Sequence, residues 1–179
     1  MDGAAYLKDV TYRFSEARRL CDRALAQVPF ERWGERLDPE SNSLVTLILH
    51  LAGNMRSRWT DFLTSDGEKH DRNRDAEFED AAHLSREALL ERWESGWKCL
   101  FDGMASLTED DLERVITIRA EPHTVVAAVD RQLTHAWYHT GQMVFLAKHL
   151  TGGRWQTLSV PRGGSGAFNA ARMGKPPGA

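Results

Sequence analysis

The strongest chemical signal in the sequence is a pair of histidines, His135 and His139, in the segment HAWYH. Residues four apart on an α-helix differ by about 40° around the helix axis and by about 6 Å along it. Both imidazoles can therefore reach a single ion. The same spacing also fits histidines that are solvated or only hydrogen-bonded, so a metal site requires at least one more ligand.

A candidate for that further ligand is His50, which lies in a second predicted helix beside its apolar stripe. A histidine in a core-facing helix is unusual unless its ring nitrogens are satisfied. Catalytic zinc sites commonly use three protein ligands, and helix bundles build such sites from facing helices. His50, His135 and His139 are thus the predicted ligands of one divalent ion.

Four segments show apolar residues at helical spacing, and they predict an all-α fold, a four-helix bundle. Pro122 suits the first turn of the last helix, and Gly152 suits its end. Gly141, inside that helix, suggests a close helix–helix contact or clearance at the site. The predicted helices span residues 4–27, 43–63, 85–107 and 122–150.

The segments between and after these helices are polar or rich in glycine and proline. Residues 64–84 form a long charged loop between the second and third helices, and residues 115–118 form an irregular or strand-like link. Loops of this length in compact domains are usually functional or mobile. We expect residues 1–153 to form the bundle with its three-histidine site. Residues 154–179 form an irregular tail packed on the bundle, with its last residues disordered.

Composition restricts the class of protein. Of 179 residues 41% are hydrophobic and 27% charged, the net charge is −3, and there are two cysteines. There is no basic run of the kind that nucleic-acid binding requires, no apolar run long enough to cross a membrane, and no signal peptide. Two cysteines without a C-x-x-C spacing suit a reduced compartment. We expect a cytoplasmic protein that binds neither nucleic acid nor membrane.

In three segments the chain resembles the bacterial DinB/YfiT-like metalloenzyme family. They are LILHLAGNMRSRWTDFLTSDGEK at 47–69, PHTVVAAVDRQLTHAWYHTGQMVFLAKHL at 122–150 and LSVPRGGSGAFN at 158–169. The resemblance implies a four-helix bundle in which His50, His135 and His139 bind a divalent metal, nickel or zinc.

The resemblance also suggests a reaction, but it leaves several functions open. Related members include thiol-dependent S-transferases and isomerases, while other members have no known activity. One expectation is therefore a transferase that uses a low-molecular-weight thiol and an electrophilic substrate. A metal-bound thiol is held as the thiolate, which is the nucleophilic form. A second expectation is a non-catalytic, metal-stabilised homodimer that binds a ligand. A third is a metal-dependent hydrolase, because three imidazoles can lower the pKa of bound water.

Five polar residues are the candidates for substrate binding beside the metal. Asn54 lies one turn after His50, and Arg58 one turn further on, while Gln142 lies two turns after His135. Arg162 and Asn169, in the tail segment that carries the resemblance, are expected to line the mouth of the metal pocket, where arginine favours an anionic group. No residue is an obvious general base, so the catalytic residues are left unassigned.

Overall fold

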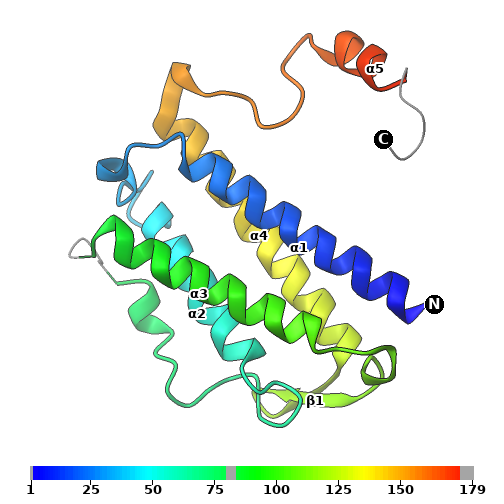
Figure 1. Cartoon of the computed structure of the whole chain (residues 1–179). Coiled ribbons are helices and arrows are strands. Elements are labelled where there is room, and N and C mark those ends of the chain that lie inside the picture. The colour runs from blue at the N-terminus through cyan, green and yellow to red at the C-terminus, as the bar shows by residue number, and fades with distance from the viewer. Residues whose placement is uncertain (1, 80–83, 174–179) are drawn as a thin grey trace.

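The computed structural model describes residues 2–79 and 84–173, and most of them are helical. Figure 1 shows the long helices side by side, with a small hairpin at one end and a short last helix set apart from them. The predicted all-α class is therefore confirmed, with a two-stranded sheet added to it. The elements are α1 (Gly3–Leu25), α2 (Leu44–Trp59), α3 (Arg86–Ala105), β1 (Val115–Ile118), β2 (Glu121–Thr124), α4 (Val125–Thr151) and α5 (Ser165–Met173).

A side-chain cap marks the start of each long helix. Free backbone N–H groups in the first turn are satisfied by an oxygen of the preceding residue. The caps are Asp2 for α1, Ser43 for α2, Ser85 for α3 and Thr124 for α4. At its end, α4 stops at Gly152 with φ 62°, a conformation that glycine adopts without strain. The capping residues therefore predict the helix boundaries to within a few residues.

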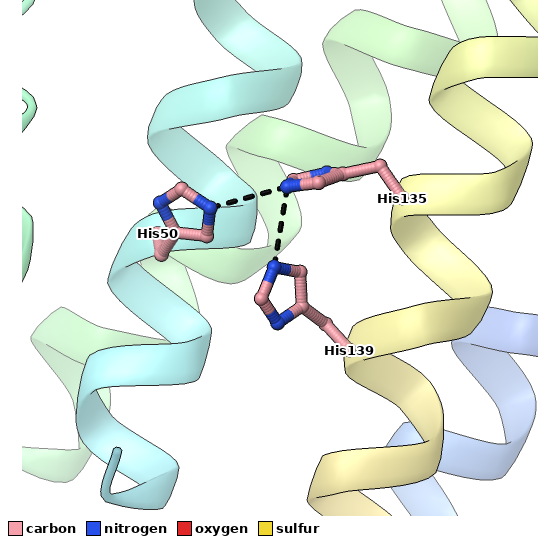
Figure 2. A group of neighbouring side chains, drawn as sticks. All are labelled: His50, His135 and His139. Atoms are coloured by element: carbon pink, nitrogen blue, oxygen red, sulfur yellow. Dashed lines mark hydrogen bonds between the residues drawn. The ribbon is translucent and has the colours of Figure 1, made fainter. Parts of the chain in front are cut away.

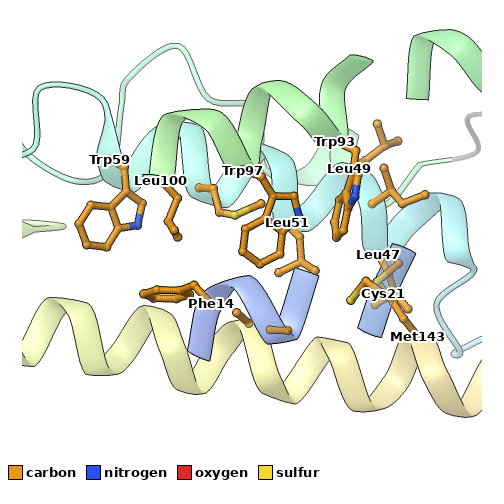
Figure 3. Close-up of a cluster of buried hydrophobic side chains, with 14 of the residues drawn as sticks. Phe14, Cys21, Leu47, Leu49, Leu51, Trp59, Trp93, Trp97, Leu100 and Met143 are labelled. Carbon is orange, nitrogen blue, oxygen red and sulfur yellow. The ribbon is translucent and has the colours of Figure 1, made fainter. Parts of the chain in front are cut away.

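The central element is α2, which packs against both α3 and α4. Fourteen of its 16 residues are buried, including polar ones such as His50 and Asn54. Figure 3 shows the aromatic side chains Trp93 and Trp97 of α3 among the buried residues of α2. A helix that is covered on nearly all sides places any polar residue it carries inside the protein, where the residue needs a partner.

Two sequence predictions about backbone structure are wrong. The last long helix does not begin at Pro122, because residues 121–124 pair with β1 as an antiparallel strand. This pairing depends on the turn at Arg119 and Ala120, whose φ angles of 56° and 62° match a type I′ hairpin turn. The tail is not irregular throughout, because residues 165–173 form α5. The alanines in this stretch favour helix, which the average composition of the tail obscured.

The tail packs on the long helices only through its first part. Trp155 and Leu158 contact the core, and the Leu158 carbonyl accepts a hydrogen bond from Arg23. By contrast, α5 buries no residue, and Figure 1 shows it standing off from the four long helices. The predicted disorder of the last residues mainly concerns residues 174–179, which lie outside the described part. In that part, no helix has both the length and the apolar character needed to cross a membrane.

Two glycines inside long helices have opposite surroundings. A Cβ at Gly96 of α3 would lie 2.7 Å from Ala52 Cα, so α2 and α3 touch at this point. A Cβ at Gly141 of α4 would meet nothing within 4 Å. The close contact or clearance expected at Gly141 is therefore wrong, and the close contact is at Gly96.

We predict that Gly96→Ala destabilises the protein by about 1–3 kcal/mol, because the added methyl forces α2 and α3 apart. Gly141→Ala is the matched control, since it makes the same change in a helix with open space. It is expected to add up to about 1 kcal/mol of stability through helix propensity. Urea unfolding followed by circular dichroism measures both. Equal effects of the two substitutions would contradict the close contact.

Candidate metal centre

Three histidine side chains from two helices converge inside the protein. His50 comes from the middle of α2, and His135 and His139 come from successive turns of α4. Figure 2 shows their Nε2 atoms facing one another. His135 Nε2 lies 3.1 Å from His50 Nε2 and 3.2 Å from His139 Nε2. The structure therefore brings together the three ligands that were predicted from sequence.

The distances between these nitrogens fit a shared ion. Two nitrogens bound tetrahedrally to zinc at about 2.0–2.1 Å are about 3.3 Å apart. The two measured separations are within a few tenths of an ångström of this value. One ligand atom from each of the three residues lies within 4.8 Å of the others. The three histidines thus form a group that could bind a metal ion without a change of fold.

The outer ring nitrogens of two histidines have acceptors, which decides where their protons lie. His50 Nδ1 donates to Glu77 Oε2 at 2.9 Å, because an ionised carboxylate can only accept. His139 Nδ1 donates to Gln142 Oε1, also at 2.9 Å. A ring that carries its single proton on Nδ1 has an unprotonated Nε2, whose lone pair points toward His135.

The protons available do not satisfy this cluster of nitrogens. A neutral His135 carries a single N–H, so through Nε2 it can donate to His50 or to His139 but not to both. Burial, together with the neighbouring His139 and His50, lowers the pKa of His135 to about 3. Burial also lowers the pKa of His139, although the hydrogen bond to Gln142 acts to raise it. A cation at the centre would accept all three lone pairs, whereas hydrogen bonding alone leaves at least one unpaired.

The acceptor of His50 is a buried carboxylate in the long loop between α2 and α3. Glu77 lies in a single helical turn, Asp75–Glu77, and is 8% exposed. Arg72 donates to both of its oxygens at 2.8 Å. Burial alone would raise the pKa of Glu77, but the hydrogen bonds from His50 and Arg72 outweigh burial and leave the pKa below its ordinary value. Glu77 is therefore ionised, and it orients His50 as carboxylates orient metal-binding histidines.

Glu77 reaches His50 because α2 has a glycine at the point of approach. A Cβ at Gly53 would lie 2.2 Å from Glu77 Oε1. Glu77 was not predicted from the sequence, in which no acidic residue has an assigned role, because a carboxylate in a loop has no periodic signal. The sequence feature that could have indicated a close partner of α2 is Gly53, a glycine one turn from His50 in a helix otherwise made mostly of larger residues.

A cavity of about 530 Å³ opens beside the histidines. Its wall includes His50 and His135, and also Asn54 and Arg58 of α2, which were predicted to bind substrate. Gln142 contacts the site differently, as the hydrogen-bond acceptor of His139. Three of the five predicted substrate-binding residues thus lie at or beside the histidine group.

The other two predicted residues, Arg162 and Asn169, lie elsewhere. Both are exposed tail residues, and neither belongs to the wall of the cavity. The tail follows the C-terminal end of α4, whereas the cavity extends toward the hairpin and the N-terminal half of that helix. Within the described residues, the arginines beside the histidines come instead from α2, the loop, the hairpin and α4.

The fold and the histidine group characterise the chain as a helical protein with a candidate metal centre. A family described as proteins of unknown function, DUF1572, matches residues 2–164. The chain belongs to this family. Comparison with curated proteins gives no match.

We predict that Glu77→Gln weakens metal binding about 10- to 100-fold while the fold is kept, because glutamine can still accept from His50 but lacks the charge that pairs with Arg72. Calorimetric titration with Zn²⁺ measures the affinity. Glu94→Gln is the matched control, since Glu94 also accepts from an arginine, Arg18, but on the exposed surface. An unchanged zinc affinity in Glu77→Gln would show that this carboxylate does not support His50.

We predict that Gly53→Ala also weakens zinc binding, because it changes the residue of α2 against which Glu77 packs. The added methyl occupies the space of the Glu77 carboxylate and pushes it away from His50. We expect a loss of zinc affinity about as large as in Glu77→Gln, and little further loss when both substitutions are combined, because they remove one interaction. Gly141→Ala serves as the control. Fully additive losses would place the two residues in separate roles.

Proposed function

We propose that this protein binds one divalent ion, nickel or zinc, through Nε2 of His50, His135 and His139. The observation that carries the proposal is the convergence of three Nε2 atoms with fewer protons than their hydrogen bonding needs. The buried acceptors on the outer nitrogens of His50 and His139 support it, because they fix the tautomers that ligands require. The same residues support assignment to the four-helix-bundle type of the DinB/YfiT-like metalloenzymes.

We further propose that the protein is a thiol-dependent transferase. The ion would supply Lewis acidity that holds a thiol sulfur in its deprotonated, nucleophilic form. The chain itself contributes the imidazoles of His135 and His139, whose pKa is lowered by burial, and a cavity next to His50 and His135 with apolar walls such as Trp59 and Phe62. A thiol and an electrophilic substrate could meet there away from bulk water.

The residues around the cavity favour thiol transfer over hydrolysis. A hydrolase that activates water usually places a carboxylate or a free histidine beside the ion as general base. The described wall of the cavity contains no aspartate or glutamate, and Glu77 already bonds His50 and Arg72. A thiol needs no such base, because binding to a metal is sufficient to deprotonate it.

A second candidate function is a metal-stabilised homodimer that binds a ligand without catalysis. It is favoured by an apolar stripe on the outer face of α4, where Trp137 and Phe145 are 38% and 65% exposed on either side of the open Gly141. Trp137 and Phe145 lie about two turns apart, each about one turn from Gly141. Light scattering on the full chain and on Phe145→Lys tests it, and a monomer in both would exclude the dimer.

We predict that Zn²⁺ or Ni²⁺ raises the melting temperature and that a chelator reverses the shift, because an ion that binds only the folded state stabilises it. At about 100 times the dissociation constant the gain is about 2.7 kcal/mol. His135→Ala should abolish the shift and the bound metal, as measured by elemental analysis. His149→Ala, which removes an exposed histidine from the same helix, should leave both unchanged. Equal metal content in His135→Ala and the unchanged protein would overturn the proposed ligands.

Catalysis is tested with the metal-loaded protein, a panel of low-molecular-weight thiols and a chromogenic electrophile. Thiol transfer predicts consumption of thiol that depends on metal and is lost in His135→Ala. Metal binding with no turnover of any thiol would favour the non-catalytic function.

A further inference from the structure

The cavity beside the histidines is strongly basic. Five arginines contribute to its wall, and the described part of that wall contains no carboxylate. They come from four different parts of the chain: α2, the loop after it, the turn of the hairpin and α4. The arginines are Arg58, Arg72, Arg74, Arg119 and Arg131.

The carboxylates behind this wall do not balance its charge. Glu68 accepts from Arg58 at 2.9 Å and from Arg119 at 2.7 Å, and Glu77 pairs with Arg72. Three arginines thus share two carboxylates. The Arg131 side chain makes no ion pair or hydrogen bond within the described part of the chain. The wall carries excess positive charge even without an ion at the histidines.

Arg131 is placed to act together with the histidines. It lies four residues before His135 on α4, so the two side chains occupy one face of the helix, about one turn apart. The backbones of Arg131 and His135 are therefore about 6 Å apart along the helix axis, and both side chains line the cavity.

Arg119 approaches the cavity from the hairpin through an unusual backbone conformation. Arg119 and Ala120 both have positive φ, which residues other than glycine rarely adopt. The carboxylate of Asp66 accepts the N–H groups of both residues at 2.8 Å and so holds the turn. Backbone strain that is stabilised in this way is common at binding sites.

The rest of the wall is apolar or carries buried donors. Trp59, Phe62, Ile116 and Ile118 supply apolar surface. Trp59 Nε1 and Gln132 Nε2 are buried without a hydrogen-bond partner among the described residues. Buried donors without partners cost free energy, which a ligand with acceptor atoms would recover.

We propose that the cavity binds a small amphipathic anion. Its carboxylate pairs with Arg131 and Arg119, its apolar part lies on Trp59 and Phe62, and its reactive end points toward the histidines. As a statement about the substrate, this inference rests on the proposed function, because it names the class of molecule that would meet the metal. The anion site itself is made of protein groups and does not require the ion.

The test uses a matched pair of probes, 3-phenylpropionate and 3-phenylpropanol, which differ in charge but share the apolar part. Calorimetric titration is carried out on the full chain, both loaded with Zn²⁺ and stripped with chelator. We expect the acid to bind at least about tenfold more tightly than the alcohol in both states. Arg131→Gln should weaken binding of the acid about tenfold and leave the alcohol unchanged.

Arg92→Gln is the control, since Arg92 is an exposed arginine within a long helix and outside the cavity. It should keep the full preference for the acid. Equal binding of acid and alcohol would overturn the proposal, and so would failure of the acid to bind at millimolar concentration. A preference that exists only with Zn²⁺ and survives Arg131→Gln would also overturn it, because the carboxylate would then be bound to the metal. Failure of the chain to bind Zn²⁺ would overturn the proposed function alone, since the comparison in stripped protein does not depend on metal.

Discussion

The site depends on the burial of one side chain, the imidazole of His50. A histidine on a helix that is covered on nearly all sides must find a partner for each ring nitrogen, because leaving a buried polar atom unpaired costs about 1–3 kcal/mol. Glu77 satisfies Nδ1, and the nitrogens of α4 converge on Nε2. Several other features follow from these two contacts. Gly53 leaves room for the Glu77 carboxylate, and Arg72 pairs with that carboxylate. The loop after α2 folds back so that Glu77 reaches His50.

This arrangement explains why the loop between α2 and α3 is long and charged. Its Glu77 accepts from His50 of α2, and its Glu68 accepts from Arg58 of α2 and Arg119 of the hairpin. Arg72 lies between these two carboxylates in the loop. A shorter connection could join the two helices, but it could not place carboxylates behind both the histidines and the arginines. The loop therefore has two roles: it orients a candidate metal ligand, and it sets the charge of the adjacent cavity. Glu68, Arg72 and Glu77 are ion-paired inside the protein. Other charged residues of the loop, such as Asp71 and Glu79, are exposed.

Features that depend on local sequence were predictable, and features that depend on distant partners were not. Capping residues and apolar spacing give the four long helices, and the spacing of His135 and His139 gives two of the three candidate ligands. The start of α4 was wrong because it is fixed by pairing with β1, and Arg162 was misplaced because nothing in the sequence shows where the tail leads. Glu77 was missed for the same reason. Its role exists only because a loop 27 residues further along the chain returns to His50.

The two halves of the site are connected through Arg72. This side chain is 5% exposed, bonds Glu77 behind His50, and lies 3.6 Å from Glu68, which holds Arg58 and Arg119 at the cavity. Buried charges interact more strongly than surface charges because less water screens them. The geometry thus gives a continuous chain of charged contacts from the arginines of the cavity to one of the candidate metal ligands, although the two groups lie on different elements.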